Sequence, residues 1–219
     1  MSRRRQLLPA ALGVLVLAAL ATALLAGKGG SHTPSSPVVN VPAEAPQDAV
    51  SSQGGFDGAA VPARAPRPFS LIDQYGRAVS LSSLHGSPVV LAFLYAHCGA
   101  PCVLIAQQIR GALDELGSHP VPVVIISADP AGDTPPAIRS FLAGVSLSGR
   151  AYYLTGPATE LAAIWDDYGV HPASAGRAAF ANYASVRLLD KRGRERVVFG
   201  SEQLTAEGLV HDIGRLRAG

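Results

Sequence analysis

The sequence of 219 residues contains only two cysteines and carries a formal net charge of only +2. A net charge this small, with no basic stripe in which aromatic residues are interleaved, argues against a nucleic-acid-binding protein. No internal repeat is visible, and the length suits one compact domain with additional segments. A domain of this size does not need a disulfide to be stable, so the cysteine pair is a candidate for chemistry.

Charge is also absent from residues 7–27, which follow three arginines at residues 3–5. As a helix, these 21 residues would span roughly 31 Å, about the thickness of a bilayer core. The arginines predict that the N-terminus stays in the cytoplasm while the rest of the chain is exported. We therefore expect residues 1–27 to be a single-pass anchor in the cell membrane, with the domain on the extracytoplasmic side. A cleaved signal peptide is the alternative, since residues 21–23 resemble a cleavage site. No cysteine ends the run, which excludes a lipoprotein.

Large apolar residues are scarce between residues 28 and 66, where six prolines and five glycines occur. Such a segment cannot bury enough surface to fold, so we predict a disordered tether over 28–66 with a reach of roughly 35 Å. The globular domain is then expected at 67–219.

The two cysteines, Cys98 and Cys102, lie directly after the apolar run 89–95. That run is short and rich in β-branched residues, which predicts a buried strand. A helical pattern follows from Ile105 to Leu116. The start of a helix carries partial positive charge and favours a thiolate, and sulfurs at positions i and i+4 can share one helical face.

Three interpretations of the pair remain open at this point. Cys98 and Cys102 can form a structural disulfide. They can be a redox dithiol, in which one thiolate attacks a partner disulfide and the other resolves the mixed disulfide; Cys98 is then the expected nucleophile. They can also bind a soft metal such as Cu(I) or zinc, with one or two further ligands. Outside the cytoplasm thiols meet an oxidising environment, so a lone pair there needs a reductant, a metal or both.

Strands and helices alternate through the rest of the domain and end in a hairpin and a helix, which predicts an α/β fold with a mixed sheet flanked by helices. We expect strands at 68–73, 89–95, 121–127, 151–154, 184–190 and 195–199. One helix is expected from Cys102 to near Gly117, and a second from the prolines at 135–136 to about Leu147. Two more are expected at 159–168 and at 204–216. Either Asp133 or Thr134 is expected to cap the second helix.

Several segments of residues 67–219 resemble the Sco/SenC family. The segment 69–76 is similar to the family's F-x-L-x-D-Q-x-G, and 126–135 is similar to its I-S-V-D-P-x-x-D-T-P. Residues 93–102 resemble F-x-Y-T-x-C-x-x-x-C, with Ala96 in place of the threonine. Residues 165–170 and 188–193 also fit.

The resemblance implies a thioredoxin-like domain tethered outside the cytoplasm by an N-terminal transmembrane helix. It further implies a copper-binding protein that helps to assemble the copper centre of cytochrome c oxidase, closer to a metallochaperone than to an enzyme. Copper would bind as Cu(I) through Cys98 and Cys102. The implied partner is a respiratory oxidase subunit or another copper or thiol protein.

One position departs from the family pattern. The family's third copper ligand is a histidine eight residues before Asp190, and here that position is Asn182. His171, in the same predicted loop, is the candidate replacement. Three of the remaining histidines, His85, His97 and His119, are expected to be solvated or hydrogen-bonded. His32 in the tether and His211 on the last helix are expected to lie at the surface.

The missing histidine keeps an extracytoplasmic thiol–disulfide oxidoreductase without a metal as the alternative function. A peroxiredoxin is disfavoured because Tyr95 stands where that family has threonine. An inert disulfide would instead indicate a binding module.

Asp129 and Asp133 flank a loop that the fold can bring near the thiols. Helix capping and turn formation are the expected function of both, with a polar network around the thiols as the alternative. Trp165 and Tyr168 are expected to serve packing.

Overall fold

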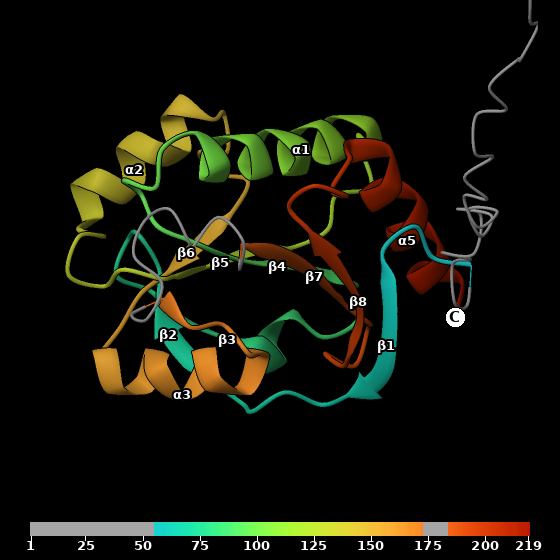
Figure 1. Cartoon of the computed structure of the whole chain (residues 1–219), viewed down its shortest axis with the longest axis horizontal. Coiled ribbons are helices and arrows are strands. Elements are labelled where there is room, and N and C mark those ends of the chain that lie inside the picture. The colour runs from blue at the N-terminus through green and yellow to red at the C-terminus, as the bar shows by residue number, and fades with distance from the viewer. Residues whose placement is uncertain (1–54, 173–183) are drawn as a thin grey trace, which may run out of the picture. The chain divides into compact units, whose positions relative to one another are not determined.

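A six-stranded mixed sheet forms the centre of the computed structural model, which describes residues 55–172 and 184–219 (Figure 1). The strand order is β1-β8-β7-β4-β5-β6, and β2 and β3 form a separate two-stranded sheet. The strands are β1 (Ala59–Arg64), β2 (Ser70–Ile72), β3 (Ala78–Ser80), β4 (Val89–Leu94), β5 (Val123–Ser127), β6 (Tyr152–Leu154), β7 (Ser185–Leu189) and β8 (Glu195–Gly200). The helices are α1 (Ala100–Leu116), α2 (Pro135–Gly144), α3 (Ala158–Tyr168) and α5 (Ala206–Ala218), with a 3-10 turn at Leu81–Leu84. The predicted α/β fold with a mixed sheet flanked by helices is confirmed.

The centre of the sheet is apolar on both faces. Strands β4 and β5 run parallel, and every residue of both is buried. Figure 1 shows α1 on one side of the sheet and α3 on the opposite side, and α5 packs beside α1. A strand covered on both faces has no need of alternating polar residues, which explains the continuous apolar runs.

Helix α1 is amphipathic and bounded by glycines. Ile105 and Ile109 are buried, whereas Leu104 is 59% exposed. Gly99 precedes the helix with φ 81°, and Gly117 ends it with φ 54°. Both values lie in the region that a residue without a Cβ adopts at little cost, so the glycines fix where the helix begins and ends.

The predicted tether is wrong at its C-terminal end, because residues 59–64 form strand β1. This strand pairs antiparallel with β8, and Ala60 lies opposite Val197. Its residues are mostly exposed or half-buried, so backbone pairing rather than side-chain burial holds it in place. Pro62 is tolerated because β1 is an edge strand. Composition alone therefore could not distinguish this strand from the tract before it.

The predicted anchor at 1–27 lies outside the described residues. Within 55–172 and 184–219, no helix is both long enough and apolar enough to cross a bilayer.

Gly58 provides a test of the contact between the start of β1 and β8. A Cβ at this position would lie 2.9 Å from Cε2 of Phe199, which is itself buried. Gly58→Ala is expected to lower the free energy of unfolding by about 1–3 kcal/mol, the usual cost of overpacking. Chemical denaturation of the full chain measures the change. The matched control is Gly214→Ala in α5, where no neighbouring atom lies within 4 Å of the new Cβ. An equal effect of the two substitutions would contradict the packing of β1 described here.

Candidate dithiol site

The two cysteines lie where β4 gives way to α1. Cys98 belongs to the connecting loop, where its N–H donates to the carbonyl of Tyr95 at 3.1 Å. Cys102 lies in the first turn of α1. The expectation that both sulfurs share one helical face is therefore corrected, since only Cys102 is helical. The positive φ of Gly99 turns the chain between them.

In the structure Cys98 and Cys102 are joined by a disulfide, and their Cα atoms lie 5.7 Å apart. The two residues differ in their exposure. Cys102 is fully buried, whereas Cys98 is half-buried at the rim of the core. A reagent or partner therefore reaches the pair from the side of Cys98.

A buried carboxyl group supports the loop that carries Cys98. Asp133 is only 2% exposed, and its Oδ1 accepts the N–H of Ala96 at 2.7 Å. Its Oδ2 accepts the hydroxyl of Ser127 at 2.6 Å and that of Tyr153 at 2.8 Å. The hydroxyl of Tyr153 also lies 3.2 Å from the carbonyl oxygen of Leu94. Asp133 thus connects the cysteine loop to the ends of β4, β5 and β6.

The surroundings of Asp133 shift its proton equilibrium. Burial raises the pKa of Asp133 above its ordinary value of 3.8, although hydrogen bonds from Ser127, Ala96 and Tyr153 act in the opposite direction. Burial, followed by the charge of Asp133, raises the pKa of Tyr153 well above 10.0. The tyrosine hydroxyl therefore keeps its proton and remains a donor.

Helix capping, turn closure and the polar network near the thiols each belong to a different side chain of the loop 129–134. Thr134 caps α2, and its Oγ1 accepts the N–H of Ala137. Asp129 closes the turn, where its Oδ1 accepts the N–H of Gly132 at 3.1 Å. The capping interpretation is wrong for Asp133, which points inward to the cysteine loop instead.

Ser127 belongs to this site although the sequence analysis did not single it out. Besides donating to Asp133, its carbonyl accepts the indole N–H of Trp165 at 3.0 Å. The signal was available, because Ser127 is a polar residue that ends an otherwise apolar strand just before the Asp-Pro turn. The expected packing function of Trp165 now includes a specific hydrogen bond to the end of β5.

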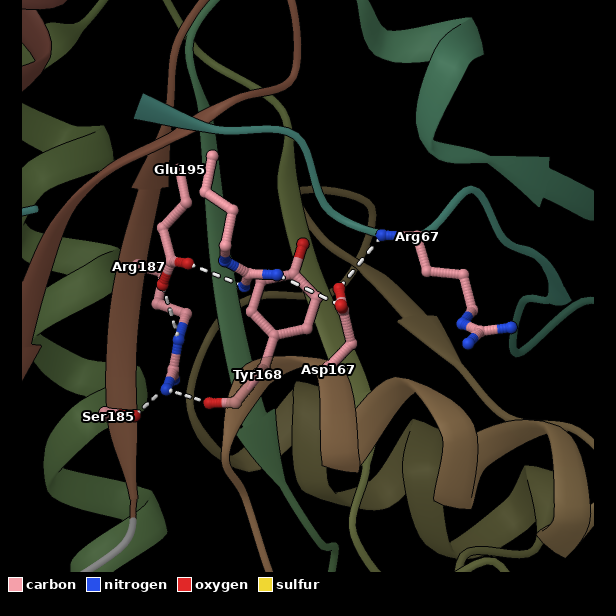
Figure 2. A network of polar contacts seen from close by, with 7 residues as sticks. Arg67, Asp167, Tyr168, Ser185, Arg187 and Glu195 are labelled. Carbon is pink, nitrogen blue, oxygen red and sulfur yellow. Dashed lines mark hydrogen bonds and ion pairs between the residues drawn. The ribbon is translucent and has the colours of Figure 1, made fainter. Parts of the chain in front are cut away.

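A network of ion pairs and hydrogen bonds is centred on Arg187 and Glu195 (Figure 2). Arg187 and Glu195 are 8% and 6% exposed and pair at 2.9 Å. The guanidinium of Arg187 lies 5.5 Å from the ring centroids of both Phe93 and Tyr168. Arg64 of β1 adds a second ion pair to Glu195 at 2.8 Å. The network therefore joins β1, β7, β8 and α3.

The structure does not bring His171 to the sulfurs. Its side chain is 55% exposed and its Nδ1 lies 4.0 Å from a carboxylate oxygen of Asp166. Among the described residues, one group of three His, Cys, Asp or Glu side chains places its ligand atoms within 4.8 Å of one another, namely Asp57, His211 and Asp212. It includes neither cysteine. Asn182 lies outside the described residues, so His171 as a ligand stays a prediction.

The other histidines are placed as follows. His97 and His85 are exposed, and His119 is exposed beside the hydroxyl of Ser118. The Nδ1 of His211 lies 2.9 Å from the buried carboxylate of Asp212, so His211 is held by a specific contact rather than simply solvated.

Comparison with known sequences agrees with the resemblance seen in the motifs. The family model SCO1/SenC matches residues 58–217. The protein SenC of Rhodobacter capsulatus is 34% identical over 76 residues, which are 34% of this chain and 34% of that protein. The match thus spans about a third of the length of this relative.

Comparison with solved structures finds the same fold. ScoI of Bradyrhizobium japonicum, solved with copper bound, is 28% identical with a TM-score of 0.53, and the match covers 69% of this chain and 99% of that one. Yeast Sco1 with copper bound is 21% identical with a TM-score of 0.60, covering 73% and 95%. BsSco, described as having a disulfide switch and as a member of the Sco family of cytochrome c oxidase assembly proteins, is 21% identical with a TM-score of 0.62, covering 70% and 94%. The predicted thioredoxin-like domain is confirmed. Since the family model matches most of the chain, this protein belongs to the SCO1/SenC family.

Proposed function

We propose that this protein is a membrane-anchored accessory protein that carries Cu(I) on Cys98 and Cys102 for assembly of the copper centre of a respiratory oxidase. The observation that carries the proposal is the cysteine pair itself, which follows β4 in a SCO1/SenC domain and leaves Cys98 partly exposed. Two relatives of the same fold were solved with copper bound. Thiolates are soft ligands and suit Cu(I).

The disulfide must be opened before the sulfurs can bind a metal. A dithiol partner would supply two electrons and two protons, leaving Cys98 and Cys102 as thiols while the partner becomes a disulfide. Binding of Cu(I) then releases the thiol protons, because the thiolate is the ligand. The half-buried Cys98 is the sulfur that an incoming thiolate can attack, and Cys102 is the leaving group inside the domain.

The asymmetry of exposure also favours a second candidate function. An oxidoreductase needs one accessible sulfur that forms the mixed disulfide and one protected sulfur that resolves it. Cys98 and Cys102 differ in just this way. Asn182, at the family's histidine position, adds weight to this alternative because an amide is a poor ligand for a soft metal.

A titration of the reduced full chain with Cu(I), without oxygen and against a competing chelator, separates the two functions. We expect one Cu(I) per chain, and Cys98→Ser should weaken binding by about a hundredfold or more, since even outer-shell changes typically cost roughly 10–100-fold. His171→Ala tests the third ligand, and His119→Ala, at another exposed histidine, is its matched control. If Cu(I) stays with the chelator while the chain readily reduces a partner disulfide, the oxidoreductase is the correct function.

A further inference from the structure

A strongly basic pocket lies apart from the dithiol. It has a volume of about 300 Å³ and is formed by the turn between β7 and β8, the end of α5 and Phe56. Five cationic side chains line it, against one carboxylate side chain, that of Asp190. The cations are Lys191, Arg192, Arg194, Arg196 and Arg215. A concave surface with such an excess of one sign concentrates ligands of the opposite sign.

The side chain of Asp190 does not neutralise the pocket. Asp190 pairs with Arg194 at 2.8 Å and, more distantly, with Arg196 at 3.7 Å. Its Oδ1 also accepts the N–H groups of Arg192 and Arg194, so it shapes the turn. The ammonium group of Lys191 donates to the carbonyl of Arg217 at 2.6 Å. A carbonyl is neutral, so this contact does not balance the positive charge of Lys191.

Two arginines show how the pocket is prepared for an anion. The guanidinium of Arg215 lies 5.4 Å from the ring centroid of Phe56. This contact holds the Arg215 side chain beside the first described residues of the chain. The side chain of Arg192 is exposed and forms no ion pair with any residue in 55–172 or 184–219. Guanidinium groups bind phosphate oxygens through paired N–H donors, so a phosphate group is the anion that this set fits best.

The pocket and the dithiol lie at opposite ends of the sheet. Strand β7 runs antiparallel to β4 with Leu189 opposite Val89, so the turn after β7 lies beside the start of β4. The cysteine loop follows the end of β4. Six residues of strand separate the two ends by about 20 Å.

Phe56 belongs both to the pocket and to the first described residues of the chain. The described chain therefore begins beside the basic pocket, on the side of the sequence that carries the predicted anchor. We propose that the basic pocket binds the phosphate of an anionic lipid headgroup, which places this end of the domain on the membrane and turns the dithiol away from it. The inference rests on the membrane location in the proposed function.

Hydrogen exchange of the full chain in phosphatidylcholine bilayers, with and without phosphatidylglycerol, tests the proposal. Phosphatidylglycerol is expected to slow exchange of the amides at 190–196, and added salt should reverse the effect. Arg192→Gln should reduce the slowing by about fivefold, the equivalent of ~1 kcal/mol per cation near an anionic surface. Arg139→Gln is the matched control, because it removes an exposed arginine from α2, outside the pocket.

Equal exchange in the two bilayers, or equal effects of the two variants, would overturn the proposal. Slowing by inorganic phosphate in the absence of any lipid effect would also overturn it and indicate a site for a free anion. Cu(I) titration of Arg192→Gln should match the wild type, so a failure of lipid binding is distinguishable from a failure of the copper function. A chain that leaves both bilayers during flotation would contradict the membrane location itself.

Discussion

Replacing Arg187 by methionine is expected to lower the free energy of unfolding by about 3–5 kcal/mol, the usual cost of removing one partner of a buried ion pair. The substitution removes the ion pair to Glu195 and the contacts of the guanidinium with Phe93 and Tyr168. It also removes the hydrogen bond from Arg187 to the carbonyl of Tyr168, which Figure 2 shows at the end of α3. Methionine fills a similar volume, so the loss measures charge and hydrogen bonding more than a cavity.

Denaturant unfolding of the full chain measures this loss. Two further variants serve as a control and as a test of coupling between the two residues. Arg196→Met on the same strand as Glu195 removes a more exposed arginine with a 3.7 Å pair, and should cost less than about 1 kcal/mol. The double replacement Arg187→Met with Glu195→Met should be less destabilising than the sum of the single changes, because each single change leaves the other residue without this buried partner, and the double change removes both members of the pair. Additive effects would contradict the coupling of the pair described here.

Asp133→Ala is expected to have the second largest effect, and it should act on both the fold and the disulfide. The change leaves the N–H of Ala96 and the hydroxyls of Ser127 and Tyr153 without their common acceptor. Each buried group left unpaired costs roughly 1–3 kcal/mol, so a loss of about 3 kcal/mol in unfolding free energy is expected. Because Ala96 lies two residues before Cys98, the loosened loop should also shift the disulfide toward the dithiol by about tenfold in glutathione buffers, ~30 mV. Thr134→Ala, which removes only the cap of α2, is the control and should leave the redox equilibrium unchanged.

The pH dependence of Asp133 provides an independent test through Asp133→Asn. Burial raises the pKa of Asp133, so the folded chain holds this proton more tightly than the unfolded chain does. The resulting stabilisation is complete below the unfolded pKa of about 3.8 and is lost as the pH rises through the raised folded pKa. The asparagine variant does not titrate at this position. Its free energy of unfolding should therefore increase relative to that of the wild type as the pH rises through that window. A constant difference from acid to neutral pH would show that burial does not control this carboxyl group.

The sequence predicted the elements that depend on a continuous pattern. The apolar runs gave β4 and β5 to within two residues, because strands buried on both faces leave an unbroken signal. The prolines after Thr134 marked the start of α2 for a local reason, since they fit the first turn of a helix. The cysteine pair was identified because the sequence has only two cysteines and both lie between the predicted strand and the predicted helix.

The features that were missed depend on contacts between distant segments. The connection of Asp133 to Ala96 spans 37 positions, and a local pattern cannot distinguish an inward carboxylate from a helix cap. Arg187 lies in a strand whose other residues are apolar or small, and only the fold places Glu195 beside it. Strand β1 has no alternation of its own, because its place is set by the edge of β8.

The pairing of β1 with β8 has a practical consequence for recombinant work on this protein. A fragment that begins at residue 67, the domain boundary predicted from composition, would lack β1 and leave the backbone N–H and carbonyl groups of β8 unpaired along one side. An uncovered edge strand of this kind is a template for self-association through new strand pairs. Such a fragment would dimerise or precipitate through β8, and its copper stoichiometry would describe an aggregate, so soluble fragments should begin before Gly55.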